Sequence, residues 1–192
     1  KPYREAYAKA AEFVELLRSD GHNITQLDLG GGLGITYDAE IAPSPAEYGR
    51  MVKEVVGHLG CNVSFEPGRL ISGNAGVLIT QVIFIKEGID RKFCIIDAAM
   101  NDLIRPTLYN AYHDIVPVVE APTSADQLTM DIVGPICESG DYLAKGRKMA
   151  ALGNGDLLAV RTAGAYAAVM ASVYNSRTLV PEVLVHGNTY SA

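Results

Sequence analysis

Two glycine-containing turns follow short apolar runs near the start of the chain, and both are suited to holding a phosphate. The first turn, at 30–32, is Gly-Gly-Gly after the run 26–29, and the second, at 66–69, is Glu-Pro-Gly-Arg after the run 62–65. Glycine lets backbone N–H groups approach an anion because no Cβ intervenes. Either turn alone is more often a tight turn that needs positive φ. Two turns at equivalent places in consecutive strand–helix units favour anion binding, as at the edge of a (β/α)8 barrel.

The second turn also carries two charged side chains with possible roles in chemistry. Glu66 could pair with a protonated ring nitrogen of a cofactor, and Arg69 could bind a phosphate or a substrate carboxylate. A surface ion pair between Glu66 and Arg69, which would contribute little stability, is an equally simple interpretation of the same spacing. The residue types therefore allow a site here without requiring one.

A thiol with polar neighbours lies in the second half of the chain. Cys137 is followed by Glu138, and Asp141 closes the same loop. A partly exposed thiol in such a loop could transfer a proton, although a cysteine after an apolar run is more often a small core residue. Glu138 and Asp141 could equally be solvated carboxylates.

Two further places combine a polar side chain with a turn-forming residue. Arg105 and Tyr109 lie four residues apart and could clamp a carboxylate, while Pro106 predicts an extended backbone at Arg105. Tyr166, after Gly164, could close a pocket with its hydroxyl or simply pack at the start of a helix, which is the commoner role.

The elements that must position these residues differ between the two parts of the chain. Helical spacing of apolar residues predicts a helix over 2–19 and another that begins after Ser44 and ends at Gly60, with Glu47 completing a capping box. Strands are predicted at about 25–29 and 62–66. From about residue 77 onward β-rich runs separated by turn residues dominate, at 77–85, 92–96, 115–120, 130–133, 157–161 and 182–186. We therefore expect two domains, at 1–76 and 77–192.

Composition excludes several classes of protein. The net charge of −6 argues against a nucleic-acid-binding protein. No apolar run is long enough to span a bilayer, and the start of the chain lacks a signal-peptide pattern. We therefore expect a cytoplasmic protein that does not bind a membrane. The three cysteines fit reduced thiols, and the four histidines show no ligand spacing with them, so we predict no metal site.

Five motifs in one order are much more specific than any of them alone. They are Gly-Gly-Gly at 30–32, Glu-Pro-Gly-Arg at 66–69, Arg-Pro-x-x-Tyr at 105–109, Cys-Glu-Ser-Gly-Asp at 137–141 and Ala-Gly-Ala-Tyr at 163–166. The set resembles the pyridoxal-phosphate-dependent decarboxylases with the alanine-racemase-type fold, and most closely the diaminopimelate decarboxylases. The resemblance covers essentially the whole chain. It implies an α/β plus all-β fold, in which the end of a (β/α)8 TIM-type barrel precedes a mostly β, sandwich- or barrel-like domain.

The resemblance also implies a cofactor and a role for each candidate residue. The cofactor would be pyridoxal 5'-phosphate, and Glu66 would face its pyridine nitrogen. Tyr166 would touch both cofactor and substrate. The remaining cofactor-binding residues would hold the phosphate region, and they are Gly31, Gly32, Pro67, Gly68 and Arg69.

For the substrate, the resemblance implies decarboxylation of meso-2,6-diaminoheptanedioate to L-lysine and CO2, the last step of lysine biosynthesis. Arg69, Arg105 and Tyr109 would bind the substrate carboxylate, Glu138 would bind the distal amino-acid end, and Cys137 would protonate the carbon that loses CO2. In this family the residues equivalent to Cys137 and Glu138 reach into the partner subunit's site, which implies a homodimer with shared active sites.

One departure from the family pattern leaves alternatives open. The family's Schiff-base lysine and the histidine that stacks on the cofactor belong to an earlier part of the barrel, and neither has a counterpart here. We therefore expect the chain to be a carboxy-terminal half that is inactive alone. A related decarboxylase of ornithine, arginine or carboxynorspermidine, a non-catalytic dimerisation relative and a generic phosphate-binding barrel fragment are the alternatives. Glu138, followed by Ser-Gly-Asp, favours diaminopimelate.

Overall fold

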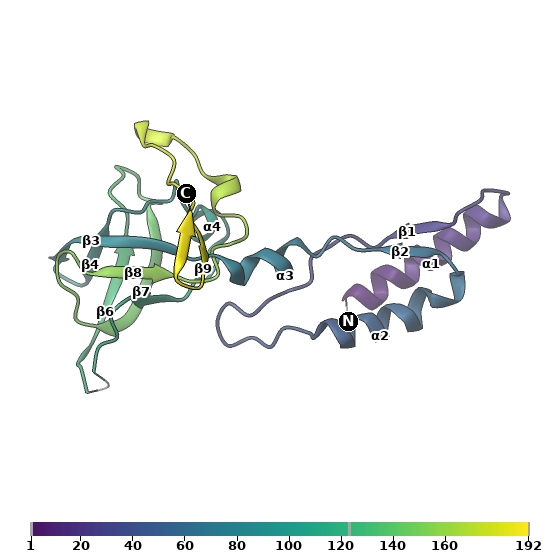
Figure 1. Cartoon of the computed structure of the whole chain (residues 1–192), viewed down its shortest axis with the longest axis horizontal. Helices are drawn as coiled ribbons and strands as arrows, with labels where there is room; N and C mark the ends of the chain where they lie inside the picture. The colour runs from purple at the N-terminus through teal and green to yellow at the C-terminus, as the bar shows by residue number, and fades with distance from the viewer. Residues whose placement is uncertain (1, 123, 192) are drawn as a thin grey trace. The chain divides into compact units, whose positions relative to one another are not determined.

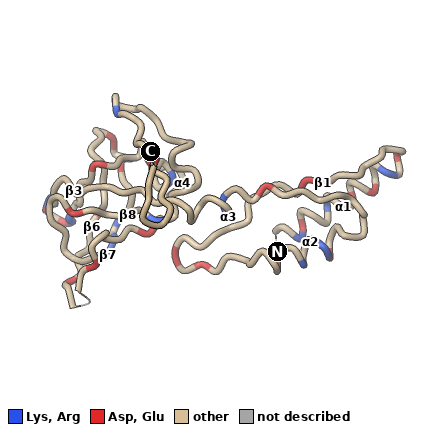
Figure 2. Tube along the Cα trace, viewed as in Figure 1, with Lys and Arg blue, Asp and Glu red and all other residues tan. Residues whose placement is uncertain are grey.

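A computed structural model describes residues 2–122 and 124–191 of the chain. The chain divides into two compact units, Lys1–Ile71 and Ser72–Ala192, which are described separately (Figure 1). Within the described residues, no helix combines the length and apolar character needed to cross a bilayer. Acidic and basic residues are interspersed along the traces of both units (Figure 2).

Two helices pack against a two-stranded parallel sheet in the first unit. Strands β1 (Gln26–Asp28) and β2 (Asn62–Ser64) pair in parallel, with Leu27 opposite Val63. Helix α1 (Pro2–Ser19) buries Tyr7, Ala11 and Val14, and helix α2 (Pro45–Val56) buries Val52 and Val56 in the same core. The strands and both helices confirm the predicted order, and the short η1 (Gly57–Leu59) extends α2.

The capping box of α2 is present as predicted from the sequence. The Ser44 hydroxyl accepts a hydrogen bond from the Glu47 N–H at 3.2 Å, and the Glu47 carboxylate accepts one from the Ser44 N–H at 3.1 Å. At the other end, Gly60 adopts the left-handed conformation with φ of 63°. These local interactions set where the chain leaves α2 and enters β2.

The second unit is mostly β and is built on a six-stranded mixed sheet in the order β5-β8-β3-β4-β6-β7. Neighbouring strands are antiparallel except β4 and β6, which pair in parallel. The sheet strands are β3 (Leu78–Glu87), β4 (Lys92–Ile96), β5 (Ile115–Pro117), β6 (Gln127–Val133), β7 (Tyr142–Ala150) and β8 (Leu157–Val160).

Short elements complete this unit. The hairpin β9 (Leu184–His186) and β10 (Thr189–Ser191) forms a separate two-stranded sheet. Helix α4 (Arg105–Tyr109) lies in the connection from β4 to β6, and the other short helical segments of this unit are η2 (Gly73–Ala75), η3 (Ala168–Met170) and η4 (Tyr174–Ser176). The short helix α3 (Gly68–Ser72) begins in the first unit and ends at the first residue of the second.

The core of this unit lies among the central strands of the six-stranded sheet. Side chains of β4, β6 and β8 are almost inaccessible, with Ile96, Ile132 and Leu158 each 0% exposed. Burial of such side chains supplies the main driving force for holding the strands together. The rigid sheet thereby supports the loops at its margins that carry the candidate site residues.

Strand β7 was not predicted, because its sequence breaks the alternation that marks a strand. Its middle contains Gly146, flanked by basic residues, and Gly146 has φ of 59°. The register with β6 shifts here, with Met130 opposite Arg147 but Ile132 opposite Ala144. The shift is a β-bulge, which moves successive side chains out of the period-two pattern.

Candidate active site

The two glycine turns of the first unit lie directly side by side. The Glu66 N–H donates a hydrogen bond to the Gly30 carbonyl at 2.9 Å. Asp28 links the same segments, because its carboxylate accepts bonds from the Gly30 N–H at 2.6 Å and the Ser64 hydroxyl at 2.7 Å. The Ser64 hydroxyl, and then the Gly30 N–H, lower the pKa of Asp28 below its ordinary value. The parallel pairing of β1 and β2 thus places both turns at one sheet edge.

Gly31 is at the tightest point between the turns. A Cβ at this position would lie 2.1 Å from the Glu66 carbonyl oxygen, which is far inside van der Waals contact. Gly30 and Gly32 adopt φ of 65° and 85°, values that side-chain-bearing residues rarely adopt. The Tyr3 hydroxyl donates to the Gly32 carbonyl, so α1 also fixes this turn. The geometry requires glycine here.

The Glu-Pro-Gly-Arg segment is a turn that leads at once into a helix. The Gly68 N–H donates to the Glu66 carbonyl at 2.8 Å, and the Ile71 N–H donates to the Pro67 carbonyl at 3.2 Å. Gly68 and Arg69 therefore belong to α3, an element that was not predicted. Glu66 is exposed and Arg69 is half-buried.

In the second unit, Arg105 begins helix α4 instead of lying in extended backbone. This outcome contradicts the expectation drawn from Pro106. A proline in the first turn of a helix costs no hydrogen bond, because N–H groups there have no intrahelical acceptor. The helix is also short, because it ends at Tyr109 and the next residue, Asn110, adopts the left-handed conformation with φ of 51°. Arg105 is buried at 7% exposure, whereas Tyr109 is exposed.

Cys137 lies in an exposed loop whose shape is set by Asp141. The two carboxylate oxygens of Asp141 accept hydrogen bonds from the Met100 N–H and the Ile136 N–H, each at 2.7 Å. The Asp141 carbonyl also accepts a bond from the Gly134 N–H at 3.0 Å. Asp141 is only 4% exposed, so its interpretation as a solvated carboxylate was wrong. Glu138 and the Cys137 thiol are exposed, which corrects the simple core interpretation of the cysteine.

Helix α4 packs directly against this loop. The Thr107 hydroxyl donates to the Gly140 carbonyl, and the Tyr142 hydroxyl donates to the Pro106 carbonyl at 3.3 Å. A Cβ on Gly140 would lie 2.9 Å from the Thr107 methyl group, so the two segments touch closely. The elements that carry Arg105 and Cys137 are therefore joined within one unit.

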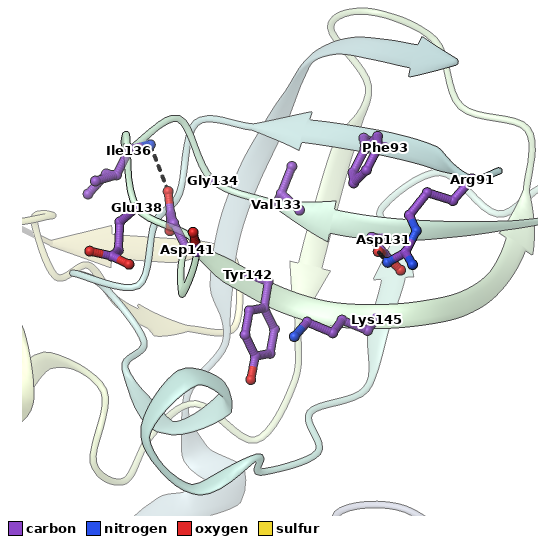
Figure 3. Close-up of a pocket in the computed structure, with 11 residues that line it drawn as sticks. Arg91, Phe93, Asp131, Val133, Gly134, Ile136, Glu138, Asp141, Tyr142 and Lys145 are labelled. Atoms are coloured by element: carbon purple, nitrogen blue, oxygen red, sulfur yellow. Dashed lines mark hydrogen bonds and ion pairs between the residues drawn. The ribbon is translucent and has the colours of Figure 1, made fainter. Parts of the chain in front are cut away.

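Glu138 lines a hollow of about 380 Å³ beside this loop (Figure 3). Asp141 and Tyr142 border it near Glu138, while Lys145 extends alongside Tyr142, with its Nζ 3.7 Å from the centre of the ring. Arg91 and Asp131 form an ion pair at 3.0 Å farther along the hollow. The wall of this hollow therefore carries both signs of charge.

Tyr166 sits in a turn that rests on the start of the second unit. Gly164 approaches the backbone so closely that a Cβ there would lie 1.9 Å from the Ser72 carbonyl oxygen. The Ala163 N–H donates to the Gly76 carbonyl at 2.9 Å. Tyr166 itself has φ of 60° and is partly exposed. A short helical segment, η3, follows it as expected from the apolar residues after Gly164.

Several buried polar residues that organise these loops were not singled out from the sequence. Asn101 donates through its amide to the carbonyls of Ser172 and Tyr174, each at 2.9 Å. Asp102 accepts a bond from the Ala99 N–H at 2.8 Å, and burial raises its pKa above the ordinary value. Asp97, Asn101 and Asp102 follow β4 within six residues. These polar residues were the available signal in the sequence that the segment after β4 forms specific buried contacts. His113, at 0% exposure, gave no such sign.

The comparison with known families identifies the class of protein. The family described as pyridoxal-dependent decarboxylase, C-terminal sheet domain, matches residues 14–164, and the chain belongs to this family. This match confirms the resemblance inferred from the five motifs.

Particular relatives narrow the comparison. The chain is 50% identical over 189 residues to the diaminopimelate decarboxylase of Zymomonas mobilis, and the matched region covers 97% of the chain and 44% of that protein. A crystal structure of AQ1208 from Aquifex aeolicus matches with a TM-score of 0.94 and 45% identity, over 100% of the chain and 47% of that structure. A crystal structure of Helicobacter pylori diaminopimelate decarboxylase complexed with L-lysine matches with a TM-score of 0.91 and 35% identity. The match covers 100% of the chain and 47% of that structure. The chain thus spans less than half the length of these relatives.

Proposed function

We propose that this chain contributes to the active site of a decarboxylase that converts meso-2,6-diaminoheptanedioate into L-lysine and CO2. The 50% identity to the Zymomonas mobilis diaminopimelate decarboxylase and the structural match to an L-lysine complex support the substrate. We further propose that residues 1–76 form the end of a (β/α)8 barrel and that residues 77–192 complete the active site of a partner subunit in a cytoplasmic homodimer.

The residues of the first unit fit pyridoxal 5'-phosphate. When bound, this cofactor delocalises the electron density that the departing CO2 leaves on the substrate carbon. Gly31 and Gly32, with Pro67, Gly68 and Arg69, would hold the phosphate region. This role is supported by the side-by-side packing of the two turns, which is so close that a Cβ at Gly31 would clash with the Glu66 carbonyl oxygen. The exposed carboxylate of Glu66 would pair with the pyridine N–H.

The cationic side chains would recognise the substrate by its charge. Arg69 and Arg105 would bind substrate carboxylate through charge-assisted hydrogen bonds, and Tyr109 would add its hydroxyl. Glu138, exposed beside Cys137, would bind the distal ammonium group. Tyr166 would contact both substrate and cofactor from its exposed turn. Holding both ends of the substrate fixes the orientation of the bond that breaks.

Cys137 would supply the proton that replaces CO2. Its thiol is exposed at the tip of a loop whose backbone is held by Asp141, so the proton donor is accessible yet positioned. The packing of α4 against this loop is the single observation that carries the proposal, because it joins a carboxylate-binding cation and a proton donor in one unit.

Replacement of Cys137 by alanine in the complete gene product tests the proton-donor role. We expect kcat for diaminopimelate decarboxylation to fall about 100-fold or more, as for loss of a general acid, while the absorbance of bound cofactor stays unchanged. Cys61→Ala removes a half-buried thiol of the first unit and is the control, with unchanged kcat. Full activity of Cys137→Ala would remove the proton-donor assignment.

Replacement of Glu138 by aspartate tests substrate selection. The shortened carboxylate should lower kcat/KM for diaminopimelate about tenfold or more by weakening its hydrogen bond to the distal ammonium. Activity is compared on diaminopimelate, ornithine, arginine and carboxynorspermidine. An unchanged preference among the four substrates would exclude Glu138 as the selector, and preferential turnover of another substrate by the unmodified protein would reassign the enzyme.

A further inference from the structure

His113 is a fully buried imidazole whose two nitrogen atoms both have defined partners. Its Nδ1 lies 3.0 Å from the Arg161 carbonyl oxygen, and its Nε2 lies 2.8 Å from Nη1 of Arg105. A carbonyl only accepts hydrogen bonds, so Nδ1 carries the proton. A guanidinium only donates, so Nε2 presents its lone pair to Arg105. The two contacts together specify a neutral ring in a single tautomer.

The backbone around His113 is fixed from neighbouring strands. Arg147, on β7, donates to the His113 carbonyl at 2.9 Å and lies over the Tyr112 ring at 4.1 Å. The Arg161 side chain pairs with the Asp114 carboxylate at 3.3 Å. These contacts hold the backbone on either side of His113 in place. The ring can therefore orient the group that it binds, Arg105.

We propose that His113 is a positioning residue for Arg105, fixing the plane of its guanidinium toward the carboxylate of an amino-acid substrate. The inference rests on the proposed function, in which Arg105 binds that carboxylate. A neutral imidazole orients the guanidinium while adding no negative charge. A carboxylate in the same place would orient Arg105 equally well but would neutralise the charge that recognises an anionic substrate.

The charged groups around the ring agree with a neutral acceptor. Burial is the largest influence and lowers the pKa of His113 below its ordinary value, the Arg161 carbonyl raises it, and the cations Arg105 and Arg147 lower it again. Both cations disfavour a second proton on the ring. His113 therefore keeps its lone pair available to Arg105 at neutral pH.

Kinetics on the complete gene product test the inference. His113→Phe removes the acceptor, and we expect KM for diaminopimelate to rise about 10- to 100-fold, the effect of losing a hydrogen bond to a charged group. The value of kcat should change much less. In His113→Gln, the amide oxygen replaces the Nε2 acceptor and should restore most of the affinity. A purely structural role would lower the amount of active enzyme and leave KM unchanged, which would overturn the proposal.

A double-mutant cycle separates action through Arg105 from an independent effect. In an Arg105→Lys background, the guanidinium that His113 orients is absent, so His113→Phe should change KM less than twofold. An effect as large as in the unmodified protein would contradict the positioning role. If Arg105→Lys alone left KM unchanged, the substrate-binding role of Arg105 in the proposed function would fail instead.

Histidine-selective ¹⁵N NMR gives a readout that does not depend on activity. We expect one histidine, assigned by its loss in His113→Gln, to have a protonated Nδ1 and an unprotonated Nε2 at neutral pH. A proton on Nε2 of His113 at neutral pH would overturn the inference even if the enzyme is a diaminopimelate decarboxylase.

Discussion

The turns around Gly31 and Glu66 meet through backbone atoms, with the exposed Asp28 carboxylate as a second link, whereas the loop around Cys137 is held by the buried carboxylate of Asp141. In the first case, two parallel strands bring the turns together and the absence of a Cβ at Gly31 allows the contact. In the second, one side chain replaces the missing regular structure by accepting two backbone hydrogen bonds. A contact between backbone atoms should fail when a Cβ is added at Gly31, whereas a loop held by a carboxylate should fail when that carboxylate is replaced.

The largest expected effect is that of Gly31→Ala. The new Cβ would lie 2.1 Å from a backbone oxygen, which has no flexible side chain to move aside. We expect a loss of at least about 4 kcal/mol in the free energy of unfolding, in the exceptional range for one substitution, and loss of cofactor binding. Urea denaturation and the absorbance of bound cofactor measure the two effects.

Gly34→Ala is the control for this substitution. Gly34 belongs to the same glycine-rich segment, but its added Cβ would meet nothing within 4 Å. Stability should change by less than about 1 kcal/mol. Equal effects of the two substitutions would refute the backbone-contact explanation.

Asp141→Asn should have the next largest effect. An asparagine offers one acceptor oxygen, so its NH2 group would face one of two backbone N–H donors. We expect a loss of about 2–4 kcal/mol in the free energy of unfolding, because a buried donor is left unsatisfied. Faster alkylation of Cys137 by iodoacetamide should accompany the loss.

The exposed Asp90 provides the matched control, since Asp90→Asn makes the same chemical change on the surface. Both measurements should stay near those of the unmodified protein. An unchanged alkylation rate in Asp141→Asn would show that another contact holds the loop around the thiol.

Acidification should weaken the second unit through His113. Burial, the largest cause, lowers the pKa of this imidazole in the folded chain, while the unfolded chain titrates near the ordinary value of about 6.5. As the pH falls through that value, the imidazole binds a proton in the unfolded state but not in the folded state. The free energy of unfolding therefore decreases.

His113→Gln removes this contribution and makes the effect measurable. The decrease in urea midpoint between about pH 7.5 and about pH 5.5 should be smaller in the variant than in the unmodified protein. Identical decreases would mean that His113 is protonated equally in both states.

The smallest expected effect has the opposite sign. Gly49 lies inside α2 on its exposed side, and a Cβ there would meet nothing within 4 Å. Gly49→Ala should therefore stabilise the protein by about 0.5–1 kcal/mol, because alanine loses less backbone entropy in a helix. The change in urea midpoint measures it, and a destabilisation would reveal a contact at this face of α2.

Local patterns predicted the parts of this fold whose cause is local. The α2 capping box follows from Ser44 and Glu47 alone, and the adjacency of the two glycine turns follows from their equivalent places after consecutive strands. The prediction of an extended backbone at Arg105 was wrong because a proline disfavours a helical residue before it but is tolerated in the first turn of a helix. In this chain the second preference decides the structure.

The buried polar residues could not be predicted in the same way. Asp141 and His113 each acquire one partner from a segment far away in the sequence, Met100 and Arg161 respectively, and polar residues of this kind are usually exposed. Nothing in the residues near Asp141 distinguishes it from a solvated loop carboxylate. The motifs thus located Arg105 and Cys137, while the groups that orient them required the tertiary structure.

The single parallel pairing in the six-stranded sheet, between β4 and β6, has a consequence for how this protein could change in evolution. Antiparallel neighbours can be joined by a two-residue turn, but parallel neighbours need a connection that returns to the starting end of the sheet. The stretch between Ile96 and Gln127 makes that return and carries Arg105 and His113 along the way. The return also contains β5 (Ile115–Pro117), so the side chains proposed to recognise the substrate carboxylate are inherited together with an edge strand of the sheet.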